Sequence, residues 1–272
     1  MAIIEDKWDR GRVIIVGGSQ GTTFTVKNSA EAAMRSGCGV VVAVVRKDIV
    51  ETLERTSGTF KIGHFDSYTE SEAAKVADLV TRSKSLVCGM GIEDAPHTIL
   101  PFFKTLIEQS RCTTVIDADV TQLLANNRNV LRDRPNLETP HVVLMNRTET
   151  ENYFGAKTPD AKVVAQEARE TNSWFVLKSK RPRIISPTGE IIEPEVAEVP
   201  QMANAGSGDV LSGLLGGMLA QGFTTRKAIL LALQIRTKAA QHYLRSTKDK
   251  TAQPQDIIRS IPFIWSQLEE YE

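Results

Sequence analysis

The chain has 272 residues, and its 33 lysines and arginines balance 33 aspartates and glutamates, so the formal net charge is zero. Its 41% hydrophobic and 24% charged residues are ordinary for a globular protein and exclude a disordered or collagen-like chain. The balanced charge argues against nucleic acid and anionic membranes as partners, and the short apolar runs predict no membrane-spanning helix.

The N-terminal residues and the cysteines predict a cytoplasmic location. The first seven residues lack the basic segment and apolar stretch of a secretory signal peptide. Cys38, Cys88 and Cys112 form no C-x-x-C pair, which fits a reducing compartment and predicts that they are buried as small apolar side chains. The histidines are scattered, so we expect no transition-metal site.

The first elements alternate between strand and helix. Residues 12–16 contain four consecutive β-branched residues, 13–16, and end at Gly17, which predicts a strand followed by a glycine turn. Asn28 and Glu31 have the spacing of a capping box, which predicts a helix that begins at Asn28. Residues 40–45 are apolar at consecutive positions, as in a parallel strand covered on both faces.

The middle of the chain repeats this alternation. A second capping box, at Thr69 and Glu72, predicts a helix through residue 80. Thr158 precedes a proline, which predicts a helix over residues 160–170 with the proline at its first position. Further strands are predicted at residues 85–88, 113–116, 141–145 and 174–177.

After residue 178 the pattern changes. Residues 182–186 and 190–193 flank a Pro-Thr-Gly turn and predict an antiparallel hairpin. Long helices are predicted at residues 209–221, 226–245 and 255–272. The alternation of strands and helices predicts a mostly parallel, doubly wound α/β sheet with right-handed crossovers. No linker or internal repeat is visible, so we expect a single domain over residues 1–272.

The strongest candidate site lies directly before the predicted helix 209–221. It comprises Asn204, Ala205, Gly206, Ser207, Gly208 and Asp209. Glycines flanking a serine at a helix start leave backbone N–H groups pointing at an anion, and the helix dipole assists. An aspartate in that first turn can accept the proton of a hydroxyl that attacks phosphorus. The alternative is a plain glycine turn in which Asp209 caps the helix.

Two further candidates follow predicted strands, where ligands collect in open α/β sheets. Asp117 and Asp119 can contact a ribose, a hydroxyl or magnesium, although Asp119 would also serve as a helix cap. Asn146 and Glu149 can share a hydrated magnesium ion that carries phosphate. A capping box explains their spacing equally well, and both interpretations can hold together.

Glycine turns after the strands at 12–16 and 85–88 form the last candidates. Gly18 with Ser19, and Gly89 with Gly91, let a substrate approach the backbone closely. Neither turn continues into the G-K-[ST] of a Walker A loop or a G-x-G-x-x-G fingerprint. Lys178, at another strand end, faces a nucleotide phosphate in this interpretation.

With these residues in hand, the chain resembles the ADP/ATP-dependent NAD(P)H-hydrate dehydratases of the ribokinase-like superfamily. The resemblance covers most of the chain and rests on these segments: Val16-Gly17-Gly18-Ser19, residues 32–39, Cys88-Gly89-Met90-Gly91 (similar to G-P-G-x-G), Asp117-Ala118-Asp119 (similar to D-A-D-A-L) and residues 202–222 (similar to G-T-G-D-V-L-x-G). Some positions depart from the family. Residues 144–149 replace T-P-H-P-G-E and look more like the N-x-x-E motif of sugar and vitamin kinases, and smaller departures occur at Cys88, Met90, Gln122 and Ser179.

The resemblance implies a three-layer α/β/α fold and an activity. Asp209 would be the catalytic base, Gly206–Gly208 the anion hole, and Lys178 with the same loop would bind the phosphates of ADP or ATP. We expect a magnesium-dependent enzyme that phosphorylates the hydroxyl of hydrated NADH or NADPH and then eliminates phosphate. The alternatives are a small-molecule kinase that keeps the phosphate on its product, and a non-catalytic nucleotide-binding regulator. The long helices also predict a homo-oligomer.

Overall fold

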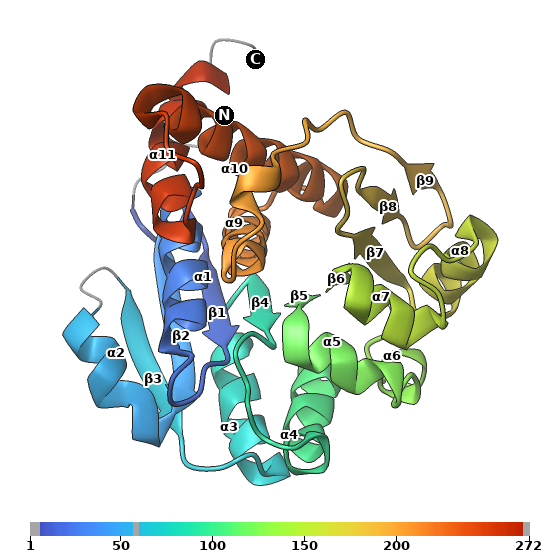
Figure 1. Ribbon diagram of the computed structural model, residues 1–272. Helices are drawn as coiled ribbons and strands as arrows, with labels where there is room; N and C mark the ends of the chain where they lie inside the picture. Colours follow the sequence, from blue (N-terminus) through green and yellow to red (C-terminus); the bar gives the residue numbers. More distant parts are fainter. Residues whose placement is uncertain (1–5, 57–59, 269–272) are drawn as a thin grey trace.

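The computed structural model of the protein describes residues 6–56 and 60–268. The strands are β1 (Arg12–Val16), β2 (Val40–Arg46), β3 (Lys61–Phe65), β4 (Ser85–Cys88), β5 (Thr113–Ile116), β6 (His141–Met145), β7 (Ser173–Leu177), β8 (Arg183–Ile185) and β9 (Ile191–Ile192). They form one nine-stranded sheet in the order β3-β2-β1-β4-β5-β6-β7-β8-β9 (Figure 1). Pairing is parallel from β3 to β7, and the predicted hairpin adds β8 and β9 antiparallel at one edge.

The helices are α1 (Thr23–Arg35), α2 (Val50–Thr56), α3 (Glu70–Val80), α4 (Pro96–Gln109), α5 (Ala118–Ala125), α6 (Asn129–Arg132), α7 (Arg147–Phe154), α8 (Ala161–Glu170), α9 (Ser207–Ala220), α10 (Thr225–Thr247) and α11 (Pro254–Leu268). Two short 3-10 helices, η1 (Lys47–Ile49) and η2 (Pro200–Met202), lie in loops. None of the helices in the described part of the chain is long and apolar enough to cross a membrane.

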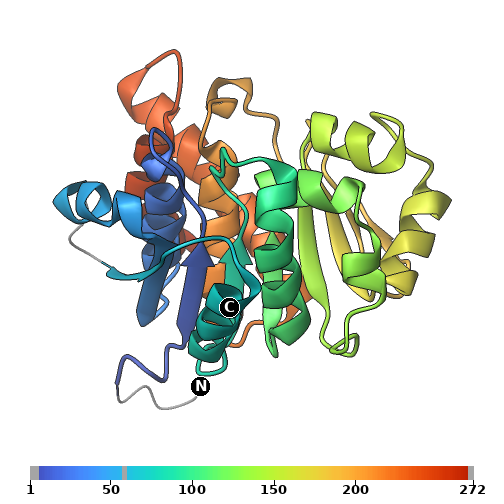
Figure 2. The ribbon, with the colours of Figure 1, turned by 90° about the horizontal axis from the view of Figure 1, so that it is seen from below.

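The sheet lies between two layers of helices (Figures 1 and 2). In β1, Val13 and Ile15 pack into one core with α1, α9, α10 and α11, whereas Ile14 and Val16 pack into the other with helices α3 to α8. Successive side chains of a strand point to opposite faces, so a strand covered on both faces must be apolar throughout. This explains the uninterrupted apolar runs and confirms the predicted α/β class.

Helix α9 is embedded in the molecule. All its residues except Gly208 are buried, and it contacts α1 along its length. Glycine makes this close packing possible: a Cβ at Gly213 would lie 2.1 Å from the carbonyl oxygen of Ser29, and one at Gly217 would lie 2.2 Å from Ser36 Oγ. The helix that begins at the candidate phosphate loop is therefore also the centre of one core.

Two predicted helix starts are wrong. Helix α1 begins at Thr23, so Asn28 is inside the helix, where it is 3% exposed and its Oδ1 accepts a hydrogen bond from Gln255 Nε2 at 2.8 Å. Its spacing to Glu31 therefore reflects neighbouring positions on a helix and not a cap. Helix α8 is capped by Asp160, which accepts from the Lys162 N–H, and not by Thr158.

Other local predictions are confirmed in part. Thr69 caps α3 by accepting from the Glu72 N–H, while the Glu72 carboxylate accepts from the Asp66 N–H. Cys38 and Cys88 are buried as expected, but Cys112 is only half-buried. The end of the predicted C-terminal helix, residues 269–272, lies outside the described residues.

Candidate active site

The strand order reverses between β1 and β4, where the sheet grows outward in both directions. Such a switch point places a crevice at the carboxyl ends of the strands. The backbone N–H of Asp117 donates to Cys88 O at 3.0 Å, and that of Lys178 donates to Met145 O at 2.6 Å. The first residues beyond β5 and β7 thus remain aligned with their neighbouring strands and share one edge.

Lys178 lies at the centre of this edge. Its Nζ is 2.5 Å from Asp117 Oδ1 and 3.8 Å from Glu149 Oε2. Burial lowers the pKa of Lys178, but the two carboxylates outweigh burial and raise it above the ordinary lysine value. The amine is therefore held as a fixed cation by side chains from β5 and α7.

Asn146 and Glu149 form a complete capping box at the start of α7. The Glu149 N–H donates to Asn146 Oδ1, while the Asn146 backbone and side-chain amides both donate to the Glu149 carboxylate. Burial raises the pKa of Glu149, and Lys178 opposes that shift. The capping interpretation of this pair is therefore correct, and the same carboxylate faces Lys178.

The turn before α9 brings the glycine loop to Lys178. Gly206 caps the helix with φ +91°, a left-handed conformation that favours glycine, and a Cβ there would lie 2.7 Å from Asn28 Nδ2. A Cβ at Gly208 would lie 3.6 Å from Lys178 Nζ and 3.7 Å from Asp117 Oδ2. The first N–H groups of a helix have no partner within it, so this end of α9 can bind an anion beside Lys178.

Asp209 occupies the first turn of α9 and is 7% exposed. Its Oδ2 is buried without a hydrogen-bond partner among the residues that the structure describes. Burial raises the pKa of Asp209 to about 8; Asp117 adds to the shift and Lys178 opposes it. A carboxyl group with such a pKa and a free oxygen is a stronger proton acceptor, once ionised, than an ordinary aspartate.

The predicted loop residues differ in what their side chains do. Asn204 uses its amide to donate to the carbonyl oxygens of Gln201 and Ala252, at 3.2 and 3.0 Å, which braces the loop from outside. Ala205 is exposed. Ser207 is buried, and its backbone N–H donates to Asn204 O at 3.1 Å. The Asn204 backbone N–H also donates to Met202 O, at 2.9 Å, so the contacts of Asn204 brace the loop and leave none of its donors for the predicted phosphate contact.

The glycine turns form a second group at the same edge. A Cβ at Gly89 would lie 2.1 Å from the carbonyl oxygen of Asp117. This turn is therefore in direct contact with Asp117, the ion-pair partner of Lys178. Asp119 Oδ2 accepts from the Ile92 N–H at 2.8 Å, and Ser19 Oγ accepts from the Glu93 N–H at 3.1 Å. The cap of α5 is Asp117 and not Asp119. Asp119 instead fixes the loop after β4.

Gly18 and Gly91 join the two turns. The Gly18 N–H donates to Met90 O at 2.8 Å. Thr22 Oγ1 donates to Gly91 O at 2.8 Å. The loops after β1 and β4 thus form one braced wall beside the switch point.

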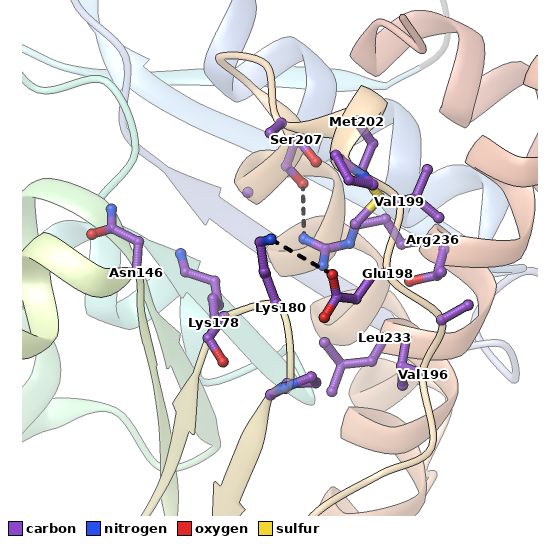
Figure 3. A pocket seen from close by; sticks show the side chains of 17 residues that line it. Asn146, Lys178, Lys180, Val196, Glu198, Val199, Met202, Ser207, Leu233 and Arg236 are labelled. Carbon is purple, nitrogen blue, oxygen red and sulfur yellow. Dashed lines mark hydrogen bonds and ion pairs between the residues drawn. The ribbon is translucent and has the colours of Figure 1, made fainter. Parts of the chain in front are cut away.

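A cavity of about 440 Å³ opens beside Lys178 and Gly208, and residues of α10 contribute to its lining (Figure 3). Its apolar part includes Val196, Val199, Met202 and Leu233, and its polar end includes Asn146 and Ser207. Sequence reasoning missed Arg236, which also lines this cavity. The available signal was its spacing: Arg236 continues the buried stripe of Ile229 and Leu233, where an arginine is unexpected.

The geometry agrees with the sequence comparison. A family model described as NAD(P)H-hydrate dehydratase matches residues 13–263. The chain belongs to the NAD(P)H-hydrate dehydratase family. Sequence analysis named this family from its motifs, and the match confirms that assignment.

Named members of the NAD(P)H-hydrate dehydratase family are distant relatives. The chain is 27% identical to the bifunctional NAD(P)H-hydrate repair enzyme Nnr of Moorella thermoacetica over 96% of its own length and 50% of that protein. It therefore spans about half the length of several curated relatives that it matches. It is 26% identical to the ADP-dependent (S)-NAD(P)H-hydrate dehydratase of Xanthomonas campestris, covering 87% of this chain and 81% of that protein.

Solved structures confirm the ribokinase-like fold of this family member. A ribokinase-like superfamily protein from Enterococcus faecalis superposes with a TM-score of 0.79 at 20% identity, covering 98% of this chain and 90% of that one. The ADP/ATP-dependent NAD(P)H-hydrate dehydratase of Bacillus subtilis, co-crystallized with ATP/Mg2+, gives a TM-score of 0.80 at 18% identity, covering 98% of this chain and 94% of that one.

Proposed function

We propose that this protein restores hydrated NADH or NADPH with ADP or ATP as co-substrate. The hydroxyl of the hydrate loses its proton and attacks the terminal phosphorus of the nucleotide, and AMP or ADP leaves. The C–O bond of the phosphorylated hydrate then breaks, and loss of inorganic phosphate with a proton from the neighbouring carbon regenerates the dihydronicotinamide ring. The observation that carries the proposal is the buried, unpartnered Oδ2 of Asp209 in the first turn of α9, beside Lys178. Family membership supports the choice of substrate.

The cavity next to α9 supplies the nucleotide site. A purine base fits its apolar part, which Val199, Met202 and Leu233 line. The phosphates then lie at Ser207 and Gly208, where the helix start provides N–H donors and the positive end of the helix dipole. Lys178 adds a fixed positive charge at the same place.

The carboxylates beside Lys178 fit a hydrated magnesium ion. No group of three or more His, Cys, Asp or Glu side chains within residues 6–56 and 60–268 is arranged to hold a metal directly. Magnesium usually keeps several waters and binds through one or two carboxylates plus substrate phosphates. Glu149 and Asn146 would hold the hydrated ion, which would neutralise charge on the nucleotide phosphates.

Asp209 acts as the base in the phosphorylation step. Once ionised, its free oxygen accepts the proton of the attacking hydroxyl, and its raised pKa makes the carboxylate a stronger base than an ordinary aspartate. The backbone of Gly206–Gly208 and Lys178 stabilise the charge on the transferring phosphoryl group. The loops that contain Ser19, Gly89 and Gly91 lie outside the nucleotide cavity. They would bind the hydrate beside Asp209 and Lys178.

Product analysis tests this function. The purified protein is incubated with hydrated NADPH, magnesium and either ADP or ATP, and NADPH and inorganic phosphate are quantified in parallel. Equal amounts of both products support the proposal, provided that Asp209→Asn abolishes them. A stable phosphomonoester would instead indicate a small-molecule kinase, in keeping with Asn146-x-x-Glu149. Binding of nucleotide without either product would indicate a regulator.

A further inference from the structure

Arg236 projects from α10 into the cavity between its polar and apolar parts (Figure 3). Its Nη1 donates to the carbonyl oxygen of Ser207 at 3.4 Å. Its Nε is buried without a hydrogen-bond partner, and within the described chain Arg236 forms no ion pair with a carboxylate. Most of its donors are therefore uncommitted.

Arg134, a buried arginine, uses its terminal nitrogens differently. Arg134 directs Nη1 to the carbonyl oxygens of Leu131 and Thr171, and Nη2 to those of Thr139 and Asn172. Its two terminal nitrogens are thus satisfied by the backbone around it, although its Nε, like that of Arg236, has no partner in the described chain. Arg236 has one long bond of this kind, so packing alone does not account for its charge.

Lys180, another cation that lines the cavity, is also arranged differently. Lys180 is exposed and lies 3.8 Å from Glu198, an ion pair open to solvent. Burial lowers the pKa of Arg236 to about 10, and Asp117 opposes the shift, so the guanidinium stays charged at neutral pH. A half-buried cation with free, forked donors at the wall of a cavity suits an anion, and phosphate matches the fork.

We infer that Arg236 binds the nucleotide phosphate nearest the nucleoside, and so adds an anchor to the site formed by Lys178 and the Gly206–Gly208 loop. This inference rests on the proposed function. Arg236 lies between Ser207, at the phosphate end, and Leu233, at the apolar end where the base fits. The first phosphate is the part of a nucleotide that joins these two regions. Arg236 therefore distinguishes a nucleotide from a nucleoside.

Calorimetric titrations with adenosine, AMP and ADP test this assignment. The proteins are the wild type, Arg236→Gln and a matched control, Arg245→Gln, which removes an exposed arginine from the same helix. Hydrogen bonds to charged groups are worth enough that Arg236→Gln should weaken AMP and ADP by roughly 10- to 100-fold. Adenosine should bind within about twofold of wild type, because the base contacts remain. Arg245→Gln should bind all three like wild type.

The outcomes separate this inference from the proposed function. Equal losses for adenosine and AMP would overturn it in favour of a structural role or a contact with the base, as would unchanged AMP affinity. Wild-type protein that binds none of the three ligands would overturn the proposed function as well. If Arg236→Gln does not fold, wild-type protein is treated with phenylglyoxal and mapped by mass spectrometry. AMP should protect Arg236 from modification and adenosine should not; equal protection by both would refute the assignment.

Discussion

Glu149 accepts hydrogen bonds from both amide groups of Asn146, at 2.7 and 2.6 Å, while Asn146 Oδ1 accepts from the Glu149 N–H at 3.0 Å. One carboxylate therefore closes the N-terminus of α7 and also lies 3.8 Å from Lys178. A glutamine at position 149 keeps an oxygen that can accept the capping hydrogen bond, but it removes the negative charge that would bind a magnesium ion. The pair thus allows capping and metal binding to be separated experimentally.

We predict that Glu149→Gln raises the magnesium concentration for half-maximal turnover and costs less than about 1 kcal/mol of stability. Thr69→Ala is the matched control, because Thr69 caps α3 with its side chain. That variant should lose about 1 kcal/mol and keep the wild-type magnesium dependence. Magnesium titrations and thermal melts measure both quantities. An unchanged magnesium requirement in Glu149→Gln would leave the residue with a capping role alone.

Asp209→Asn should reduce turnover by roughly 10²–10⁴-fold, the usual contribution of a positioned general base. Asparagine keeps the size of the side chain and the start of α9. Nucleotide affinity should therefore stay close to wild type, since the backbone donors of the loop remain. Steady-state kinetics and calorimetry check the two expectations. Near-wild-type turnover would mean that Asp209 is only a residue of the first helical turn.

The raised pKa of Asp209 also predicts a pH dependence. Because the base must be ionised, kcat/KM should rise with pH and level off above the pKa of about 8. Stability should change in the opposite direction. The folded state holds the proton more tightly than the unfolded chain does, so the stability from this group is complete below the ordinary aspartate pKa of 3.8 and is lost as pH rises through about 8.

Thermal melts of wild type and Asp209→Asn at about pH 6 and about pH 9 check the sign. The variant has no carboxylate to desolvate, so its melting temperature should gain on that of wild type at the higher pH. A constant difference between the two proteins would show that Asp209 titrates at an ordinary value in the folded state.

Gly208→Val should fold but lose stabilisation by nucleotide. A Cβ at Gly208 meets Lys178 Nζ at 3.6 Å and Asp117 Oδ2 at 3.7 Å, which are ordinary contacts, so a side chain fits but fills the space beside the lysine. Wild type should gain about 2.7 kcal/mol at a nucleotide concentration about 100 times the Kd. Melting curves with and without ATP measure the gain. If ATP raises the melting temperature of the variant as much as that of wild type, the phosphates bind elsewhere.

Gly213→Ala should destabilise the fold by about 1–3 kcal/mol, because a methyl group would meet the Ser29 carbonyl 2.1 Å away and force α9 from α1. Turnover should fall too, since Asp209 moves with the helix. Gly63→Ala is the control: its Cβ would lie 3.5 Å from Val44 Cγ2, so stability should hold. Chemical denaturation of both variants decides whether the close crossing of α1 and α9 matters.

The sequence predicts the sheet well where strands are covered on both faces, because β1, β2 and β6 are then apolar at every position except one terminal residue. It fails at β3, an edge strand whose exposed Lys61 and His64 interrupt the apolar pattern. It also misplaces the start of α1. Asn28 and Glu31 have the spacing of a cap, but the same spacing occurs inside any helix, and only tertiary packing decides between the two.

The candidate site could likewise be predicted from the sequence only in part. Strand-end residues such as Asp117 and Lys178 could be predicted to share one edge, because parallel strands bring their carboxyl ends together. The contact of Lys178 with Glu149 depends on side-chain directions that no spacing gives. Arg236 comes from a helix formed later in the chain, and its approach to Ser207 depends on how α10 packs against α9.

Because α9 is buried, Asp209 can leave its position only through the slowest motions of the protein. Amide hydrogens in a helix enclosed on all sides exchange with solvent only when the whole fold opens. The segment 210–220 should thus belong to the last unit to unfold, although the proposed catalytic carboxyl group, that of Asp209, sits one residue before it. Local fraying cannot release Asp209 on its own. Partial unfolding that leaves this protein inactive must open the core itself, so loss of activity on heating should coincide with the cooperative transition.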